Sequence, residues 1–318
     1  MLNFYKKYKV QERIVLLIRV GTRGSKLAVL QTNYLINNLK DKCGAEFEIV
    51  KIKTSGDITD PRSSQRIGSG IFEKEVDEAL LRGDIDLAVH SMKDVPTSID
   101  ENLVLAAVPQ RLPPNDVFVS YDYVSIESLP KGGVIGTSSL RRAAQIKAMR
   151  QDLQIVSLRG NVDTRLRRLN EGLFHGIVLA EAALVRMGMT DVIKERFSTE
   201  TVPTSPGQGA LAIITRRDDR EMISLVSKIN SPEAMEEVIA ERAFLRTLQC
   251  GCSSPVGCTA TVEGALLKLS CGLYSQDGVK FKLFKFKFPR GSPEECGAEA
   301  AQKVINDQDV ANFWRVGR

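Results

Sequence analysis

The sequence predicts an α/β protein with two lobes, each built on a mostly parallel β-sheet and joined by two hinge crossings, followed by a small C-terminal α+β domain with an antiparallel sheet. Three observations predict this fold class. Short apolar runs alternate with amphipathic stretches from Val10 to Leu225. Pro-rich breaks at 110–116 and 201–210 bracket a self-contained piece of chain. Over 259–288 the pattern changes to that of consecutive β-strands.

The breaks predict the domain organisation. We expect a first lobe over 14–110 and 206–226, a second lobe over 115–202, and a C-terminal domain over 230–318. A chain that leaves one α/β domain, builds another and returns forms two lobes with two connecting strands between them. Lobes of this kind close on a ligand that is held between them.

The first lobe shows strands and helices in alternation. Residues 46–54, "EFEIVKIKT", are predicted to form a strand, and residues 86–90, "DLAVH", the next one. Between them, 71–83 is predicted to form an amphipathic helix that Gly83 ends. The apolar face of this helix comprises Phe72, Val76, Ala79 and Leu80.

The second lobe repeats one plan three times. The segments "GGVIGTSSLRRAAQIKAMR", "LQIVSLRGNVDTRLRRLNEG" and "GIVLAEAALVRMG" each read as a strand followed by a helix. In the first of them, the Thr-Ser-Ser run at 137–139 is expected to cap the helix. No strict sequence repeat accompanies this structural repetition.

The C-terminal domain is predicted to begin with a helix capped by Ser231. Its antiparallel strands are expected to include a hairpin turn at 276–278. The apolar alternation in "KFKLFKFKF" changes phase between Leu283 and Phe284, which predicts a bulge or a bend. Ser292 begins a capping box that predicts a final helix.

The composition is ordinary for a soluble globular protein, with 43% hydrophobic and 26% charged residues among 318. No apolar run approaches the ~18–20 residues of a membrane span. The apolar stretch at 14–18 is too short for a signal peptide. We therefore expect a cytoplasmic protein without a membrane partner, in which cysteines are reduced.

The charge pattern favours small anionic ligands over nucleic acid. Lysine and arginine number 44 and aspartate and glutamate 39, which gives a net charge of 44 − 39 = +5. Nucleic-acid-binding proteins usually concentrate lysine on one stripe, whereas the informative cations here are arginines in short turns. Because His90 and His175 are the only histidines, a histidine-built metal site is nearly excluded, and acid–base chemistry falls to carboxylates or lysine.

Groups that bind anions follow every predicted strand of the two lobes. Ligands of open α/β sheets bind beyond the carboxyl ends of strands, and hydroxyls, arginines and helix N-termini there bind anions. These residues are Arg23 and Ser25; Ser91, Lys93 and Asp94; Thr137, Ser138, Ser139, Arg141 and Arg142; Arg159, Asn161 and Arg165; and Arg186. One such arginine is more often a surface ion pair, but six at converging strand ends favour a ligand site.

Asp94 is the one carboxylate in this positive set. It follows Lys93 and precedes a turn that Pro96 fixes. A capping role is the alternative interpretation. In a cleft of arginines, however, a lone carboxylate is suited to stabilise a cation that develops on a bound ligand.

The stretch "LQCGCSSPVG" places Cys250 and Cys252 one residue apart. The pair could form a redox couple, belong to a metal site with Cys258, or hold a group covalently through one thiol. The spacing is not that of a zinc ribbon and no fourth ligand is evident. A redox pair usually has two intervening residues. The residues alone leave the three alternatives open.

Six motifs, in this order, resemble the porphobilinogen deaminase family: "GTRGSKLA", "DLAVHSMKDVPT", "GTSSLRRAAQ", "SLRGNVDTRLRRL", "GQGALA" and "CGCSSPVG". The resemblance extends from Ile18 to the C-terminus and is strongest as far as Cys258. The combination of "HSMKDVP" with "SLRGN" is highly specific to that family.

The resemblance implies an enzyme with two lobes like those of periplasmic binding proteins and a third domain. That family condenses four porphobilinogen molecules head to tail, with release of ammonia, into the linear tetrapyrrole hydroxymethylbilane of heme biosynthesis. A dipyrromethane cofactor, bound as a thioether to a cysteine, primes the chain, and the motif assigns this attachment to Cys252. The resemblance further implies a monomer that acts on porphobilinogen and needs no metal, nucleic acid or membrane.

The resemblance also implies roles for the residues at the strand ends. Asp94 would accept hydrogen bonds from pyrrole N–H groups and stabilise the cations of the reaction. The carboxylates of the substrate chain would be held by Arg23, Arg141, Arg142, Arg159, Arg165 and Arg186. Carboxylates or cofactor would contact Ser25, Ser91, Lys93, Thr137, Ser138 and Ser139.

One loop departs from the family pattern. The family usually has Lys-x-Gly-Gly-Lys-Gly before the helix, whereas this chain reads "RIGSGIF" from Arg66, one residue shorter and without the second lysine. Arg66 is the remaining candidate for a contact from this loop. The polar segment 56–70 is expected to form a lid.

Two other functions compete with the enzyme. A non-catalytic two-lobed protein that binds small anions would explain the arginines and the hinges, but it gives Asp94 and Cys252 no task. A basic RNA-binding protein would explain only the charge.

Overall fold

The computed structural model of the protein describes residues 6–10, 13–53, 73–250 and 254–314. By contacts the chain divides into two compact units, Met1–Arg111 with Ala210–Met235, and Leu112–Gly209 with Glu236–Arg318. We call them unit 1 and unit 2 and describe each by itself. The lobe boundaries expected from the sequence stay predictions.

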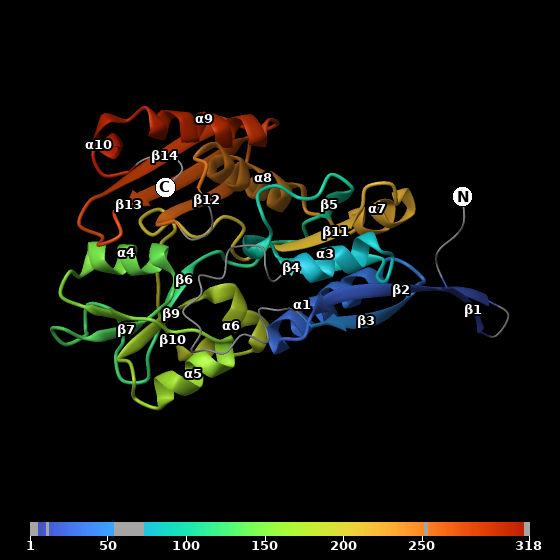
Figure 1. Ribbon diagram of the computed structural model, residues 1–318, viewed down its shortest axis with the longest axis horizontal. Coiled ribbons are helices and arrows are strands. Elements are labelled where there is room, and N and C mark those ends of the chain that lie inside the picture. The colour runs from blue at the N-terminus through green and yellow to red at the C-terminus, as the bar shows by residue number, and fades with distance from the viewer. Residues whose placement is uncertain (1–5, 11–12, 54–72, 251–253, 315–318) are drawn as a thin grey trace. The chain divides into compact units, whose positions relative to one another are not determined.

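Unit 1 is built on a six-stranded mixed sheet in the order β1-β2-β4-β11-β5, with β3 beside β2 (Figure 1). Its strands are β1 (Lys6–Val10), β2 (Arg13–Arg23), β3 (Glu46–Ile52), β4 (Leu87–Ser91), β5 (Leu103–Ala107) and β11 (Leu211–Arg216). The pairings make β2, β3, β4 and β5 run in one direction, and β1 and β11 in the other.

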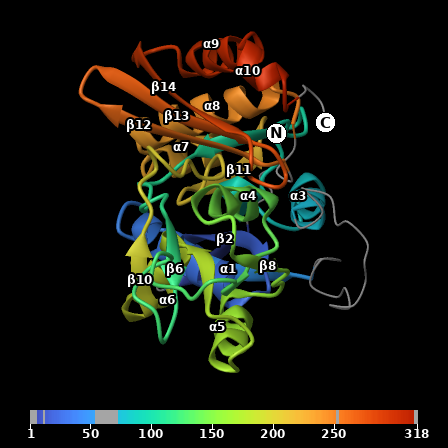
Figure 2. The same ribbon diagram turned by 90° about the vertical axis from the view of Figure 1, so that its left-hand side faces the viewer.

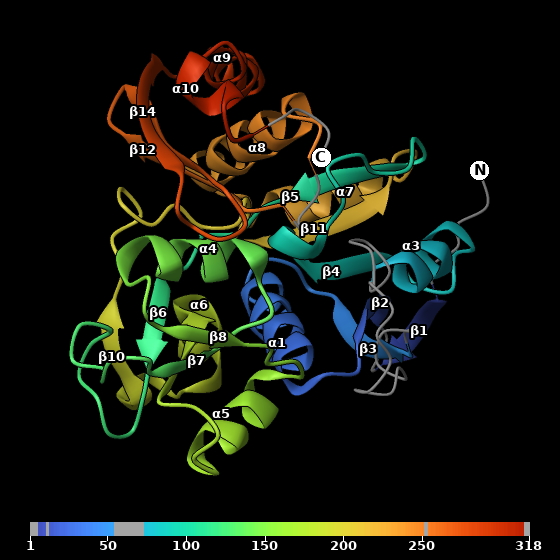
Figure 3. The ribbon, with the colours of Figure 1, turned by 60° about the vertical axis from the view of Figure 1, so that its left-hand side comes forward.

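Among the described residues of unit 1, three helices accompany this sheet: α1 (Lys26–Lys40), α3 (Lys74–Leu81) and α7 (Arg220–Ser227). In Figure 3, α1 lies along β2 and β4. Its apolar residues Leu35 and Leu39 join Ile18 and Val20 of β2 and Leu87 of β4 in one buried cluster. This burial holds α1 against the sheet.

Unit 2 contains a five-stranded mixed sheet in the order β10-β6-β9-β7-β8. Its strands are β6 (Asp116–Val119), β7 (Val134–Gly136), β8 (Gln154–Val156), β9 (Gly176–Ala180) and β10 (Ile193–Arg196). Only β6 opposes the direction of the other four. The helices that follow β7, β8 and β9 are α4 (Leu140–Met149), α5 (Val162–Asn170) and α6 (Glu181–Met187), and Ser139 caps α4 as predicted.

The remainder of unit 2 is a three-stranded antiparallel sheet with helices against it (Figure 2). Its elements are α8 (Pro232–Thr247), β12 (Val256–Glu263), β13 (Leu266–Tyr274), β14 (Phe281–Pro289), α9 (Pro293–Ile305) and α10 (Gln308–Ala311). One face of the sheet packs on α8 and α9, so that Phe244 and Val304 share a core with Leu269. The predicted fold class, two α/β lobes with mostly parallel strands and a C-terminal α+β domain, is confirmed.

The sequence predicted a bulge or a bend in β14, and of these two alternatives the bulge was wrong. The β13–β14 register runs without a shift from Leu266↔Pro289 to Tyr274↔Phe281. The apolar phase changes because the far face of the sheet is also covered at this end. There Nε2 of Gln145 in α4 donates a hydrogen bond to the Tyr274 hydroxyl oxygen at 3.4 Å. Leu283 belongs to this second apolar face, since its side chain would crowd a Cβ added at Gly272, its cross-strand partner.

Two helix ends differ from the expectation in detail. The helix expected over 71–83 is described as α3 and buries Val76, Ala79 and Leu80 as predicted. Phe72 lies outside the described residues. The final helix begins where the capping box predicted it, but the Ser292 side chain makes no capping hydrogen bond.

Among the helices of the described residues, none combines the length and the apolar character that a membrane crossing requires.

Candidate functional site

The carboxyl ends of β2 and β4 lie at one edge of the unit 1 sheet, because these two strands are adjacent and parallel. This arrangement brings together the first two groups of candidates. They are Arg23 and Ser25 at and after the end of β2, and Ser91, Lys93 and Asp94 at and after the end of β4. A short 3₁₀ turn, η1 (Met92–Asp94), carries the last two.

Local contacts engage the Ser25 and Ser91 side chains. Ser25 caps α1 by accepting a hydrogen bond from the Ala28 amide at 3.3 Å. The Ser91 hydroxyl lies 2.9 Å from Nε2 of Gln31 on α1. By contrast, the half-buried Asp94 side chain accepts no hydrogen bond from any residue that the structure describes. Its carboxylate is therefore available to a ligand.

Glu73 is a functional candidate that the sequence analysis missed. It directly precedes α3, and only 2% of its surface is exposed. Burial, followed by the negative charge of Asp94, raises the pKa of Glu73 to about 8. A signal was present in the sequence, because Glu73 falls three residues before Val76 and seven before Leu80, on the apolar face of the predicted helix.

Unit 2 gathers its candidates in the same way. Its parallel strands β7, β8 and β9 are neighbours, so their carboxyl ends share one edge of the sheet. Thr137, Ser138 and Ser139 follow β7, Arg159 follows β8, and Arg186 lies on the helix after β9.

The side chains at this edge differ in what they contact. Ser138 and Arg159 are exposed, and the Ser138 hydroxyl lies 2.9 Å from that of Ser157. Arg165 donates from Nε to the Gly160 carbonyl at 2.8 Å, and Arg186 donates from Nη2 to the Gly209 carbonyl at 2.8 Å.

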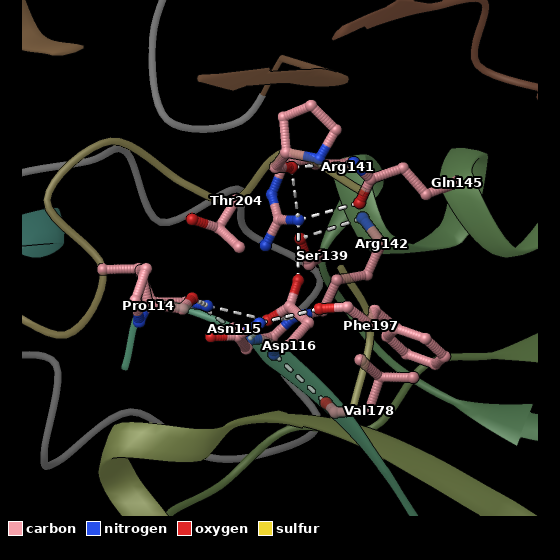
Figure 4. Close-up of polar contacts among 12 residues, drawn as sticks. Pro114, Asn115, Asp116, Ser139, Arg141, Arg142, Gln145, Val178, Phe197 and Thr204 are labelled. Atoms are coloured by element: carbon pink, nitrogen blue, oxygen red, sulfur yellow. Dashed lines mark hydrogen bonds and ion pairs between the residues drawn. The ribbon is translucent and has the colours of Figure 1, made fainter. Parts of the chain in front are cut away.

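Arg141 and Arg142 are buried instead, with 4% and 7% of their surface exposed. Both guanidiniums point at Asp116, the first residue of β6 (Figure 4). Arg141 Nη1 lies 2.7 Å from Oδ2 of Asp116, and Arg142 Nη2 lies 2.7 Å from Oδ1. In the described structure, the carboxylate that these two arginines bind is thus an internal one.

Neutral partners complete the surroundings of the two guanidiniums. Arg141 also donates to Gln145 Oε1 at 2.8 Å, and Arg142 donates to the Val178 carbonyl at 3.1 Å. Gln208 Nε2 donates to Asp116 Oδ1 at 2.9 Å. A buried ion pair is stable only when further hydrogen bonds satisfy its remaining donors and acceptors, and these neutral partners provide such bonds.

The balance of charge in this network is positive. Burial by itself raises the pKa of Asp116, but the charges of Arg141 and Arg142 outweigh burial and hold that pKa well below its usual range. Two guanidiniums against one carboxylate leave one positive charge in excess. The cluster therefore contributes a positive potential at this edge of the sheet.

Asp116 was also missed, and the topology explains why. The predicted anion-binding residues all lie at or after the ends of strands, whereas Asp116 begins a strand. Because β6 is antiparallel to β9, with Asp116 opposite Ala180, the start of β6 lies at the edge where β9 ends. The Pro-rich break at 110–116 was the available signal.

A buried carboxylate holds the segment that carries Gln208. Glu241 of α8 is fully buried and accepts hydrogen bonds from the Gly207 amide at 2.6 Å and the Ala260 amide at 2.7 Å. The Thr204 carbonyl accepts a hydrogen bond from the Cys258 amide at 2.9 Å. The segment before Gln208 is thereby attached to the C-terminal sheet.

Cys252, Arg66 and the segment expected to form a lid lie outside the described residues. Cys250 is buried in the core of the C-terminal sheet. Cys258 and Cys271 face each other there with their sulfurs 3.4 Å apart. Within the ranges that the structure describes, no group of three or more His, Cys, Asp and Glu side chains is arranged to hold a metal ion.

Comparison with known proteins identifies two family models in the chain. The model described as "Porphobilinogen deaminase, dipyromethane cofactor binding domain" matches residues 18–224, and "Porphobilinogen deaminase, C-terminal domain" matches residues 235–306.

Curated relatives of similar length match nearly the whole chain. A porphobilinogen deaminase of Bacillus cereus is 44% identical over 293 residues, 91% of this chain and 94% of the relative. That of Pelotomaculum thermopropionicum is 43% identical over 290 residues (91% and 93%), and that of Ehrlichia canis 42% over 294 residues (91% and 98%).

Solved structures show a more distant similarity. An ABC transporter periplasmic substrate-binding protein from Coxiella burnetii is 16% identical, with a TM-score of 0.43 over 69% of this chain and 94% of that one. The periplasmic VFT2 domain of BvgS from Bordetella pertussis is 14% identical, with a TM-score of 0.41 over 67% and 86%.

Proposed function

The chain belongs to the porphobilinogen deaminase family, and on this premise we propose which of its residues carry out the reaction. The enzyme is a transferase of tetrapyrrole biosynthesis. It condenses four porphobilinogen molecules head to tail, with release of ammonia, into hydroxymethylbilane, and a covalently bound dipyrromethane is its cofactor.

We propose that Asp94 is the catalytic carboxylate. Its side chain is half-buried and accepts no hydrogen bond from the described residues, which supports a role toward a ligand. Asp94 would accept hydrogen bonds from the pyrrole N–H groups of the substrate. Its negative charge would stabilise the ring cation that remains when ammonia departs, because a fixed charge in a water-poor site acts strongly on developing charge.

Arginines and hydroxyls would bind the acetate and propionate groups of the substrate. Support comes from the donor set at the two sheet edges, which offers guanidiniums that match carboxylates. In unit 1 the proposed residues are Arg23, Ser25, Ser91 and Lys93. In unit 2 they are Thr137, Ser138, Ser139, Arg159, Arg165 and Arg186. Arg141 and Arg142 would act at short range through the excess positive charge that Asp116 leaves uncompensated.

The same donor set fits the cofactor, since a dipyrromethane with carboxylate side chains requires cationic and hydroxyl donors. When bound, the cofactor supplies the covalent primer on which the product grows. We propose that Cys252 holds it through a thioether and that Arg66 contributes a contact from the loop before α3.

We propose that the protein is a monomer that acts in the cytoplasm and binds neither nucleic acid nor a membrane. The absence of disulfides among the cysteines of the described residues supports a reducing compartment. Sedimentation of the purified protein measures the oligomeric state, and a stable dimer would contradict the monomer.

The observation that carries the site assignment is Asp94, a carboxylate that accepts no hydrogen bond from the described residues and lies at an edge lined by cations. The test combines two measurements on purified protein. Treatment with acidic aldehyde reagent should give the colour of a dipyrromethane, and incubation with porphobilinogen should release ammonia. Asp94→Asn should keep the colour and lose the ammonia, whereas a protein that merely binds anions would give neither signal.

A further inference from the structure

The carboxyl group of Glu73 in unit 1 is buried, and one of its oxygens has no hydrogen-bond partner among the described residues. Only 2% of the residue surface is exposed, and within the described residues Oε2 has no hydrogen-bond partner. Native proteins rarely leave a buried polar atom unsatisfied, and the exceptions often have a functional cause. Oε2 is therefore a buried polar atom for which the described residues supply no partner.

The charged groups around Glu73 come from four elements. Asp94 belongs to η1, Arg23 to β2 and Asp77 to α3 itself. His90 of β4 lies behind Asp77, with its Nε2 3.3 Å from Asp77 Oδ1. Carboxylates thus outnumber the arginine near Glu73.

This environment keeps Glu73 protonated at neutral pH. Burial is the largest cause of its raised pKa of about 8, and the charge of Asp94 is the next, while Arg23 acts in the opposite sense. An acid–base group works best when its pKa lies near the operating pH. A carboxylate that must stay charged to stabilise a cation cannot also carry a proton, so the two tasks call for two carboxyl groups.

We propose that Glu73 is a second carboxyl group of the reaction, which gives up and takes back one proton in each cycle beside Asp94. The proposal rests on the function proposed for Asp94.

Glu73 first acts as an acid. As the C–N bond of the substrate's ammonium group breaks, both electrons leave with nitrogen as ammonia, and Oε2 of Glu73 transfers its proton to that ammonia. An ammonium ion results, and Glu73 becomes a carboxylate next to the ring cation of the substrate. The net charge of substrate and Glu73 is +1 before this step and +1 after it. After the step the ammonium ion offsets the new carboxylate, and the ring cation carries the remaining positive charge.

Glu73 then acts as a base. The acceptor ring uses an electron pair to form the new C–C bond with the cation. The C–H bond at the acceptor-ring carbon that formed this bond then breaks, and its electrons restore the aromatic acceptor ring. Oε2 takes up the released proton, which returns Glu73 to its starting form. The sum is the exchange of a ring hydrogen for the new C–C bond, with one ammonium ion released.

The first test measures turnover of the holoenzyme against pH. In the wild-type enzyme, activity should fall above about pH 8 because Glu73 loses its proton before the cycle begins. Glu73→Gln should lower kcat roughly a hundredfold and remove this fall. Glu78→Gln is the matched control, because Glu78 is exposed on the same helix and pairs with Lys74 at 3.8 Å. A Glu73→Gln enzyme with wild-type kcat would overturn the proposal.

The second test needs no turnover. Infrared difference spectra between neutral and alkaline pH should contain the carbonyl band of one protonated carboxyl group, which Glu73→Gln removes. Asp94→Asn should move the titration of this band to lower pH, because it removes a negative charge next to Glu73. A band that is absent in the wild type, or unmoved by Asp94→Asn, would refute the proposal. Normal turnover of Asp94→Asn would instead refute the role of Asp94, so the two failures are distinguishable.

Discussion

Asp116 and Arg142 form a buried ion pair in which one carboxylate oxygen, Oδ1, accepts hydrogen bonds from both Nε and Nη2 of the guanidinium, at 3.0 and 2.7 Å. The other oxygen is left to Arg141. Asp116 therefore fixes the positions of two arginines that the sequence assigned to the substrate. It is a positioning residue, because it acts through those arginines.

The first prediction concerns the stability of this pairing. Asp116→Asn should lower the free energy of unfolding by about 3–5 kcal/mol, because it leaves two buried guanidiniums without a counter-charge. Denaturant unfolding measures the effect. The control is Glu171→Gln, which breaks an exposed pair with Arg167 at 3.1 Å and should cost about 1 kcal/mol or less. Equal losses in the two variants would contradict the account of the buried pair.

The second prediction is the pH dependence of that contribution. The pKa of Asp116 is depressed in the folded state, so the unfolded chain binds a proton first as pH falls. The contribution is complete well above the unfolded pKa of ~3.9 and declines as pH falls toward and below it. Stability measured from pH 7 to pH 2 should fall less steeply in Asp116→Asn than in the wild type. Parallel curves would exclude a depressed pKa at this residue.

The third prediction separates binding from catalysis at Asp94. Asp94→Asn should fold and bind porphobilinogen, but lose ~3 kcal/mol or more of transition-state stabilisation, a loss of at least about a hundredfold in kcat. Asp100→Asn, at an exposed position beyond the same turn, should leave kcat unchanged. Near-normal turnover of the Asp94 variant would eliminate the proposed role.

The fourth prediction addresses the shape of the cationic group. Arg159→Leu should impair cofactor assembly or elongation, and Arg159→Lys should rescue poorly, because lysine cannot form the two parallel hydrogen bonds of a guanidinium. Arg167, an exposed arginine of α5 that pairs with Glu171, provides the control for loss of charge alone. Full activity of the lysine variant would mean that a diffuse positive field is sufficient.

The fifth prediction identifies the attachment residue. Intact mass should exceed that of the chain by two linked pyrrole units, and peptide mapping should assign the excess to Cys252. Cys252→Ser should lose the added mass and the activity. Cys250→Ser should keep both, since Cys250 lies in the apolar core of the C-terminal sheet. An added mass found on Cys250 would shift the assignment by two residues.

Periodicity and strand-end chemistry predicted much of this molecule from the sequence. The alternation of apolar runs with amphipathic stretches predicted the two α/β sheets, in which β2 lies parallel to β4 and β7 lies parallel to β8. These inferences succeeded because they depend on local pattern and on a general rule of sheet topology.

The remaining features depend on contacts distant in sequence. Nothing near Arg142 indicates that its partner is Asp116, 26 residues earlier, and nothing near Tyr274 reveals that its hydroxyl meets Gln145 of α4. The protonated state of Glu73 likewise arises from the fold, which places its carboxyl group near Asp94. Ion pairs between distant residues and packing on the second face of a sheet can be identified only in the folded structure. The alternation of strands and helices can be predicted from the sequence pattern alone.

The two oxygens of Glu241 connect a loop amide, Gly207, with a strand amide, Ala260. Neither amide can open to solvent without breaking a bond to the same carboxylate, so the segment before Gln208 and β12 should open as one cooperative unit. In native-state hydrogen exchange, these two amides should report the same opening free energy. The segment that carries Gln208 into the Asp116 network would then resist local opening as strongly as the sheet to which it is attached. It would do so although it has no regular secondary structure of its own.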